Sequence, residues 1–158
     1  MNPNRVMLSE ARSVEVKQLV ECWTTGITGF TTLHTDDVRK IPDRILNMMP
    51  SRQDAERLAN DVYVGMDVGI LLDTRYNAAL ERNERYISQV AFFSREEGKN
   101  ICRLVVKNGK MEDHLLELPK DILKRMKKAE IEDMFFNAEL EEQIEEERMA
   151  DEEVFTAL

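Results

Sequence analysis

The stretch "TGITGFTTLH", residues 25–34, decides the predicted fold, because it places two glycines before a short β-favouring run that ends at a histidine. Gly26 follows a segment with apolar residues at helical spacing (13–23), so we expect it to end a helix. The run 30–34 is aromatic and β-branched, which is typical of a strand. The stretch therefore predicts a helix, a tight turn and a strand that ends at His34.

The same alternation of helix and strand continues on both sides of this stretch. The run "RVMLSE" (5–10) is apolar and ends in an acid, as a buried parallel strand does. Helical spacing predicts helices within 35–49 and 52–66, and "DVGILLDTR" (67–75) is another apolar strand. This order predicts an α/β fold with a parallel sheet. Two or three parallel strands are too few to cover both faces of such a sheet, so we expect part of it to be missing.

The second half of the chain has a different pattern. Residues 85–96 and 101–110 are typical of antiparallel strands, the segment 111–119 is a further candidate, and Asn108-Gly109 is a strong hairpin-turn signal. From Lys120 onward the sequence is helical and becomes rich in glutamate. We therefore divide the chain into an α/β part, a β-hairpin extension and a helical acidic tail, with boundaries at 1–95, 96–118 and 119–158.

Composition and charge narrow the classes of protein that fit. The chain has 158 residues, enough for one domain with a modest core. Residues 130–153 hold twelve Asp or Glu and one Arg, so the rest of the chain has a net charge of about +2. Nucleic acid is not a favoured partner of such a chain. No apolar run approaches the roughly 18 residues that a membrane span needs. Cys22 and Cys102 lack metal-ligand spacing, so we expect a reduced, cytoplasmic protein without a metal site.

Two candidate catalytic residues end neighbouring strands. Glu10 follows the strand 5–10 in the way that nucleotide hydrolases place an acid, where it polarises a water molecule or orients Mg²⁺. His34 ends the next strand and would hydrogen-bond a phosphate or that water. The alternatives are a solvated strand-end acid for Glu10 and, for His34, a histidine that faces solvent or is satisfied by the backbone. Thr31 and Thr32 fit strand formers better than ligands.

These features together resemble the secretion ATPase family, which powers type II secretion, type IV pili and conjugation. The segment "NPNRVMLSEAR" is similar to its Walker B segment, and "TGITGFTTLH" is similar to its histidine box. The helix with "IPDRILNMM", the strand with "VGMDVGILLDTR" and the run "ISQVAFF" follow in the family's order. The resemblance covers roughly residues 2–95. It departs from the family at Ser9 and Ile27, where a glycine and a histidine are usual.

The resemblance implies a partial RecA-like (P-loop NTPase) core of a hexameric motor that hydrolyses ATP with Mg²⁺. Glu10 would be catalytic, and His34, Arg12, Arg44 and Thr32 would sense or couple the nucleotide; surface ion pairs are the alternative for both arginines. The implied partners are further copies or full-length ATPase subunits and inner-membrane secretion machinery, with the chain cytoplasmic or peripheral at that membrane and not inserted in it.

The family's phosphate-binding loop is absent from this sequence. No G-x-x-x-x-G-K-[ST] motif occurs in it. We therefore expect the isolated chain to be inactive, either as a piece of a longer ATPase or as a small protein derived from one, and to self-associate through the strands 5–10 or 30–34. The alternative is a non-catalytic interaction module that uses its hairpin and acidic tail to co-assemble with a complete ATPase or another partner.

Overall fold

The computed structural model describes residues 5–49, 55–112 and 118–131. The acidic segment from residue 132 onward and the middle of the candidate strand 111–119 lie outside the described residues. In chain order the elements are β1 (Arg5–Leu8), α1 (Glu15–Thr24), β2 (Thr28–Thr31), the 3₁₀ helix η1 (Val38–Lys40), α2 (Ile41–Met48), α3 (Ala55–Gly65), β3 (Val68–Asn77), β4 (Arg82–Glu96), β5 (Lys99–Lys107), β6 (Lys110–Met111) and α4 (Lys120–Lys128).

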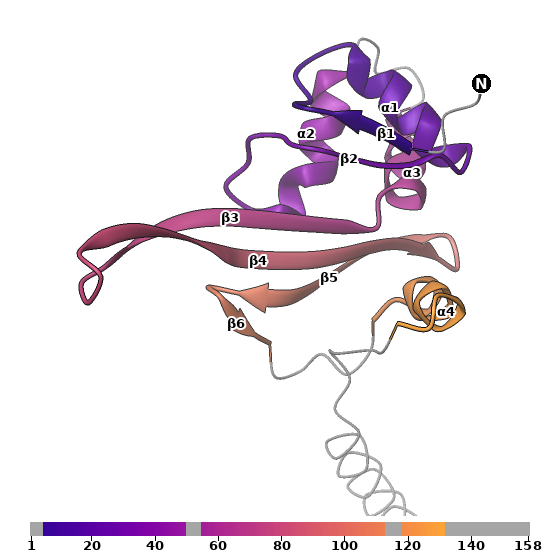
Figure 1. Cartoon of the computed structure of the whole chain (residues 1–158). Coiled ribbons are helices and arrows are strands. Elements are labelled where there is room, and N and C mark those ends of the chain that lie inside the picture. The colour runs from indigo at the N-terminus through magenta and orange to yellow at the C-terminus, as the bar shows by residue number, and fades with distance from the viewer. Residues whose placement is uncertain (1–4, 50–54, 113–117, 132–158) are drawn as a thin grey trace, which may run out of the picture.

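The strands form two separate sheets. β1 and β2 pair in parallel, with Arg5 opposite Thr28 and Leu8 opposite Thr31. The other four strands form an antiparallel sheet in the order β3-β4-β5-β6 (Figure 1). The prediction of a RecA-like parallel sheet is therefore wrong. The expected strand at 67–75 does not join β1 and β2 in one sheet, and it pairs antiparallel with β4 instead.

A tight turn between β3 and β4 explains this difference. Asn77 pairs with Arg82, and the Asn77 side-chain oxygen accepts the backbone N–H groups of Ala79 and Leu80 at 3.0 and 3.2 Å. Glu81 completes the turn with a φ of 48°. Such a short connection only permits antiparallel pairing, because parallel strands need a long crossover. The turn lacks glycine and proline, so sequence reasoning missed it.

The local elements of the first half follow the sequence closely. α1, α2 and α3 occupy the segments that helical spacing predicted. Gly26 ends α1 as expected: its φ is 87°, and the next residue, Ile27, donates its N–H to the carbonyl of Cys22 at 3.0 Å. In the antiparallel sheet, Asn108 and Gly109 both have positive φ, at 52° and 72°, which confirms the predicted hairpin turn between β5 and β6.

The core has two parts, one on each face of β4. Phe93 is fully buried and packs with Val16, Ile45 and Val62 of the three N-terminal helices. Its neighbour Phe92 points to the other face and packs with Val105, Leu118 and Ile122. Figure 1 shows the resulting layers, with α1 to α3 on one side of the antiparallel sheet and α4 on the other. Among the described residues, no helix combines the length and apolarity that a membrane crossing requires.

Candidate functional site

The carboxyl ends of β1 and β2 are tied together beyond their paired residues. The N–H of Ala11 donates to the carbonyl of Thr32 at 2.8 Å, and the Thr32 hydroxyl donates to the carbonyl of Ser9 at 2.6 Å. These two bonds extend the parallel pairing past Leu8. They place Glu10 and His34 at one edge of the strand pair, as we expected from the order of the strands.

Glu10 lies between a guanidinium and an imidazole. Its Oε1 is 3.3 Å from Nε2 of His34, and its Oε2 accepts a hydrogen bond from Nη2 of Arg12 at 2.5 Å. Only 25% of the Glu10 side chain is exposed, whereas the side chains of Arg12 and His34 are 72% and 88% exposed. The carboxylate is thus held in place while both of its partners face solvent.

The charges of this cluster favour the ionised carboxylate. The hydrogen bond from Arg12 is the main reason that the pKa of Glu10 lies below its usual value; burial opposes this shift, and the charges of Arg12 and His34 add to it. Glu10 in turn raises the pKa of Arg12. Glu10 is therefore a fixed negative charge at neutral pH. Such a group is suited to orienting water or a cation, but it is a weak general base because it does not readily accept a proton.

A carboxylate that sequence reasoning missed fixes the loop between Glu10 and α1. Oε1 of Glu15 accepts the backbone N–H groups of Arg12 and Ser13, both at 3.0 Å. The pKa of Glu15 is lowered, mainly by its own backbone N–H and further by the N–H groups of Arg12 and Ser13. The two hydrogen bonds lie just before the N-terminus of α1, and they hold the backbone of Arg12 beside Glu10.

Arg44 reaches the other side of the site from α2. Its Nε donates to the backbone carbonyl of His34 at 3.1 Å. Arg44 therefore holds the segment that follows β2 in place. All five predicted site residues thus come together at one edge, with Thr32 serving as a backbone tie between the strand ends.

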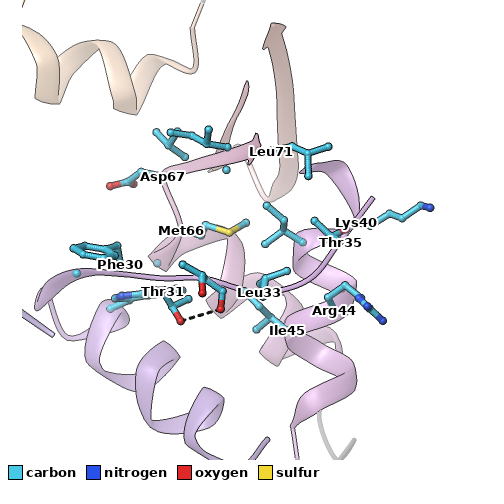
Figure 2. Close-up of a pocket in the computed structure, with 18 of the residues that line it drawn as sticks. Phe30, Thr31, Leu33, Thr35, Lys40, Arg44, Ile45, Met66, Asp67 and Leu71 are labelled. Atoms are coloured by element: carbon cyan, nitrogen blue, oxygen red, sulfur yellow. Dashed lines mark hydrogen bonds between the residues drawn. The ribbon is translucent and has the colours of Figure 1, made fainter. Parts of the chain in front are cut away.

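A groove of about 1230 Å³ runs between β2 and β3 beside this edge. Figure 2 shows Phe30, Thr31 and Leu33 on one side of it and Met66 and Leu71 on the other. The lining also includes His34 and, at the end shown on the right of Figure 2, the cationic side chains of Lys40 and Arg44.

The opposite end of the groove holds an ion pair that the sequence did not reveal. Arg125 of α4 binds both carboxylate oxygens of Asp67, at 2.8 and 2.5 Å. This bidentate pair fastens α4 to the residue that precedes β3. Its members are far apart in the chain, so no local pattern could have identified it.

Metal and nucleotide sites are often marked by two features, a cluster of ligating side chains and a glycine-rich loop. In the described parts of the chain, no three His, Cys, Asp or Glu side chains converge on a common point. Nucleotide phosphates are usually cradled by the N–H groups of a glycine-rich loop with its lysine, and this sequence has no such motif. The site offers the ionised carboxylate of Glu10 with the cationic side chains of Arg12 and Arg44 near it. Cationic side chains are one part of a phosphate-binding site.

Comparison with known proteins adds no assignment. No protein-family model matches the chain, and no curated protein matches it. The likeness to secretion ATPases therefore stays a prediction based on the motifs in residues 2–95.

Proposed function

We propose that this chain supplies the carboxylate–histidine edge of a secretion or conjugation ATPase, in which another polypeptide segment provides the phosphate-binding loop. The contact between Glu10 and His34, at the ends of parallel strands, supports this proposal most directly. The motif order of the first half of the sequence points in the same direction.

Each residue of the site has a part in this proposal that fits its geometry. Glu10 is ionised and held, so it orients a water molecule by its charge. His34 offers an exposed imidazole nitrogen to an anionic group. Arg12 bonds Glu10 yet is largely exposed, so a neighbouring subunit has access to its guanidinium. Arg44 connects α2 to the backbone of His34 and would couple movement of that helix to the site.

The remaining parts of the proposal concern the assembly. ATP and Mg²⁺ would bind only where a second polypeptide segment completes the site, so the isolated chain would not hydrolyse ATP. The complete motor would be a hexameric ring of such subunits in the cytoplasm, at the inner-membrane face of a secretion machine.

Native purification of a tagged chain from the cells that make it tests this function. We expect the co-purified assembly to release phosphate from ATP and the isolated chain to release none. Glu10→Gln should abolish turnover by the assembly while ATP binding persists, because the carboxylate acts mainly in the transition state. Glu21→Gln is the matched control, since within the described part of the chain the Glu21 side chain forms an exposed helical ion pair with Lys17, away from the site.

Two results would contradict the proposal. One is an assembly whose hydrolysis is unchanged by Glu10→Gln. The other is a pure isolated chain whose hydrolysis disappears with that substitution, because the site would then need no second segment.

A non-catalytic interaction module is the second candidate. The observation that favours it is the open edge of each sheet beside the groove, which offers a partner a place to bind. In this case tagged chain would co-purify with a partner, and the assembly would bind and hydrolyse no nucleotide.

A further inference from the structure

We propose that the groove between β2 and β3 binds one apolar β-strand of another polypeptide, which pairs with both strands at once. This inference rests on the co-assembly that both proposed functions share. It names the binding surface and the chemistry of the partner, and it requires nothing of Glu10.

The first support is that two strand edges face the same groove. Among the described residues, β2 pairs with β1 alone and β3 with β4 alone. The whole of β2 and the first five residues of β3 (68–72) line the groove. The two edges are therefore similar in length, and both match the usual length of a strand. A β-bulge between Leu71 and Leu72 then interrupts the regular pairing of β3 with β4 at the end of this stretch.

The second support is that neither edge carries the features that protect exposed strands. Natural edge strands are commonly blunted by charged side chains or by proline. The sequence of β2 is TGFT, and the groove-lining part of β3 is VGILL, with no charge and no proline in either. The charged residues of β3 begin at Asp73, beyond the groove.

The third support is the apolar character of the lining. Phe30 and Ile70 are 61% and 55% exposed although they are large hydrophobic residues. Leu33 also lines the groove, and so do the buried core residues Ile45 and Met66 (Figure 2). A partner strand with apolar side chains would bury this surface, whereas charged side chains placed between the two charged ends of the groove would lose their hydration without compensation.

The connection between the two strands also indicates a vacant strand position. The chain passes from β2 to β3 through η1, α2 and α3, and these helices share one core cluster with α1 and with Phe93 of β4. Strands that are joined by such a helical crossover commonly lie in one sheet. Here they lie in different sheets with the groove between them, so one added strand would join the two sheets.

Other occupants fit this groove less well. A small molecule would leave the backbone N–H and C=O groups of two strand edges without the regular partners that a strand provides. A second copy of the chain carries both of these edges inside its own groove. An extended apolar segment of a different polypeptide satisfies both edges and the apolar lining together.

Peptide binding to the purified chain tests the inference. The probe is an end-capped octapeptide: six residues of alternating valine and isoleucine, roughly 20 Å long when extended, with a lysine added at each end. Trp23 is the only tryptophan and lines the groove, so its fluorescence reports binding. We expect saturable binding and slowed amide exchange in both 28–31 and 68–72.

Matched variants and a modified peptide locate the interaction. Ile70→Lys should weaken binding roughly tenfold or more, because the probe no longer buries that side chain. Leu80→Lys should leave binding unchanged, since Leu80 is similarly exposed, at 52%, but lies outside the groove. A probe with N-methylated alternate amides should bind more weakly, because it can form a ladder of hydrogen bonds along only one of its two edges.

Three results would overturn the inference. The first is no change in Trp23 fluorescence or in amide exchange at millimolar peptide. The second is equal binding of the N-methylated probe. The third is a concentration-dependent dimer, detected by light scattering, that protects both edges without peptide, because the occupant would then be a second copy. None of these measurements involves nucleotide, so peptide binding without ATP turnover by the native assembly would retain the groove and reject the ATPase.

Discussion

Glu10 and His34, which follow two different strands, meet with 3.3 Å between Oε1 and Nε2. This contact depends on the parallel pairing of β1 and β2, which places the carboxyl ends of both strands at one edge. The hydrogen bond from Thr32 to Ser9 joins the two chain segments just before Glu10 and His34. The rigidity of the site therefore depends on this short two-stranded sheet, and the first two predictions below concern it.

Gly29→Ala should separate β1 from β2. A Cβ atom at this position would lie 1.9 Å from the backbone oxygen of Val6, which has no freedom to rotate away. We expect a loss of about 1–3 kcal/mol in the free energy of unfolding, as overpacking typically causes. Urea unfolding measures the loss, and faster amide exchange in 5–8 and 28–31 locates it. Gly98→Ala is the control for the location of the effect: its φ of 80° strains an alanine, although a Cβ there meets nothing within 4 Å, so it should also lower stability while exchange in β1 and β2 stays unchanged. Unchanged exchange in Gly29→Ala would contradict the observed pairing.

Thr32→Val should loosen the site without removing any charge. The substitution keeps the shape of the side chain but leaves the carbonyl of Ser9 without its hydroxyl donor. Because Thr32 is exposed to water, we expect a loss of only about 0.5–1 kcal/mol. Thr31→Val is the matched control, since the Thr31 hydroxyl only contacts the adjacent carbonyl of Thr32 at 3.4 Å. Equal effects of the two substitutions in urea unfolding would show that the bond to Ser9 does not stabilise the strand ends.

The ionised form of Asp37 should stabilise the protein, so the free energy of unfolding should decrease at acidic pH. The guanidinium of Arg39 is the main cause of a pKa of about 2 for Asp37, and the backbone N–H of Arg39 adds to it. A lowered pKa means that the contribution to stability is complete above about pH 4, the ordinary range of an aspartate, and is lost as the pH falls toward 2. We expect this contribution to be about 1 kcal/mol or less, because Arg39 is exposed.

Unfolding of wild type and Asp37→Asn across pH 2–6 measures this dependence. The difference in stability between the two proteins should shrink as the pH falls through this window. Asp36→Asn is a useful comparison, because Asp36 pairs with Lys40 at the surface and its pKa is also lowered. A difference between wild type and Asp37→Asn that stays constant over the whole range would show that the Asp37–Arg39 pair is not formed.

The attachment of α4 should depend on packing more than on its ion pair. Ile122 is 5% exposed and packs against Phe92, so Ile122→Ala should cost about 2–4 kcal/mol. Arg125→Gln removes the bidentate contact with Asp67, but both side chains are about half exposed, so the loss should be at most about 1 kcal/mol. Amide exchange in 120–128 compares the two variants on the same helix. A larger loss of stability in Arg125→Gln than in Ile122→Ala would show that the ion pair, and not packing, attaches α4.

The sequence predicted those features that depend on neighbouring residues. Apolar spacing identified the helices, Gly26 identified the end of α1, and Asn108-Gly109 identified a hairpin turn. The meeting of Glu10 with His34 was also predictable, because consecutive strands separated by one helix tend to pair in parallel.

Features that depend on distant residues were not predictable. The segment VGILL at the start of β3 is apolar on both faces, so its pattern fits a parallel strand as well as an antiparallel one. The turn after Asn77 makes β3 pair antiparallel with β4. This turn is held by a side-chain hydrogen bond of Asn77 and contains no glycine that would have revealed it in the sequence. The Asp67–Arg125 pair, and the hydrogen bond from the Val38 N–H to the side chain of Gln89, join segments whose proximity only the folded chain creates.

The opposite orientations of Phe92 and Phe93 in β4 have a consequence for how the molecule unfolds. Each side chain anchors one of the two apolar clusters, and a single backbone segment carries both. Neither cluster can lose its anchor while the other keeps a native strand. The layer of α4 and the layer of α1 to α3 should therefore melt in one cooperative transition. Fluorescence of Trp23 on one face and amide exchange of α4 on the other should report the same midpoint, so the chain would behave as one folding unit.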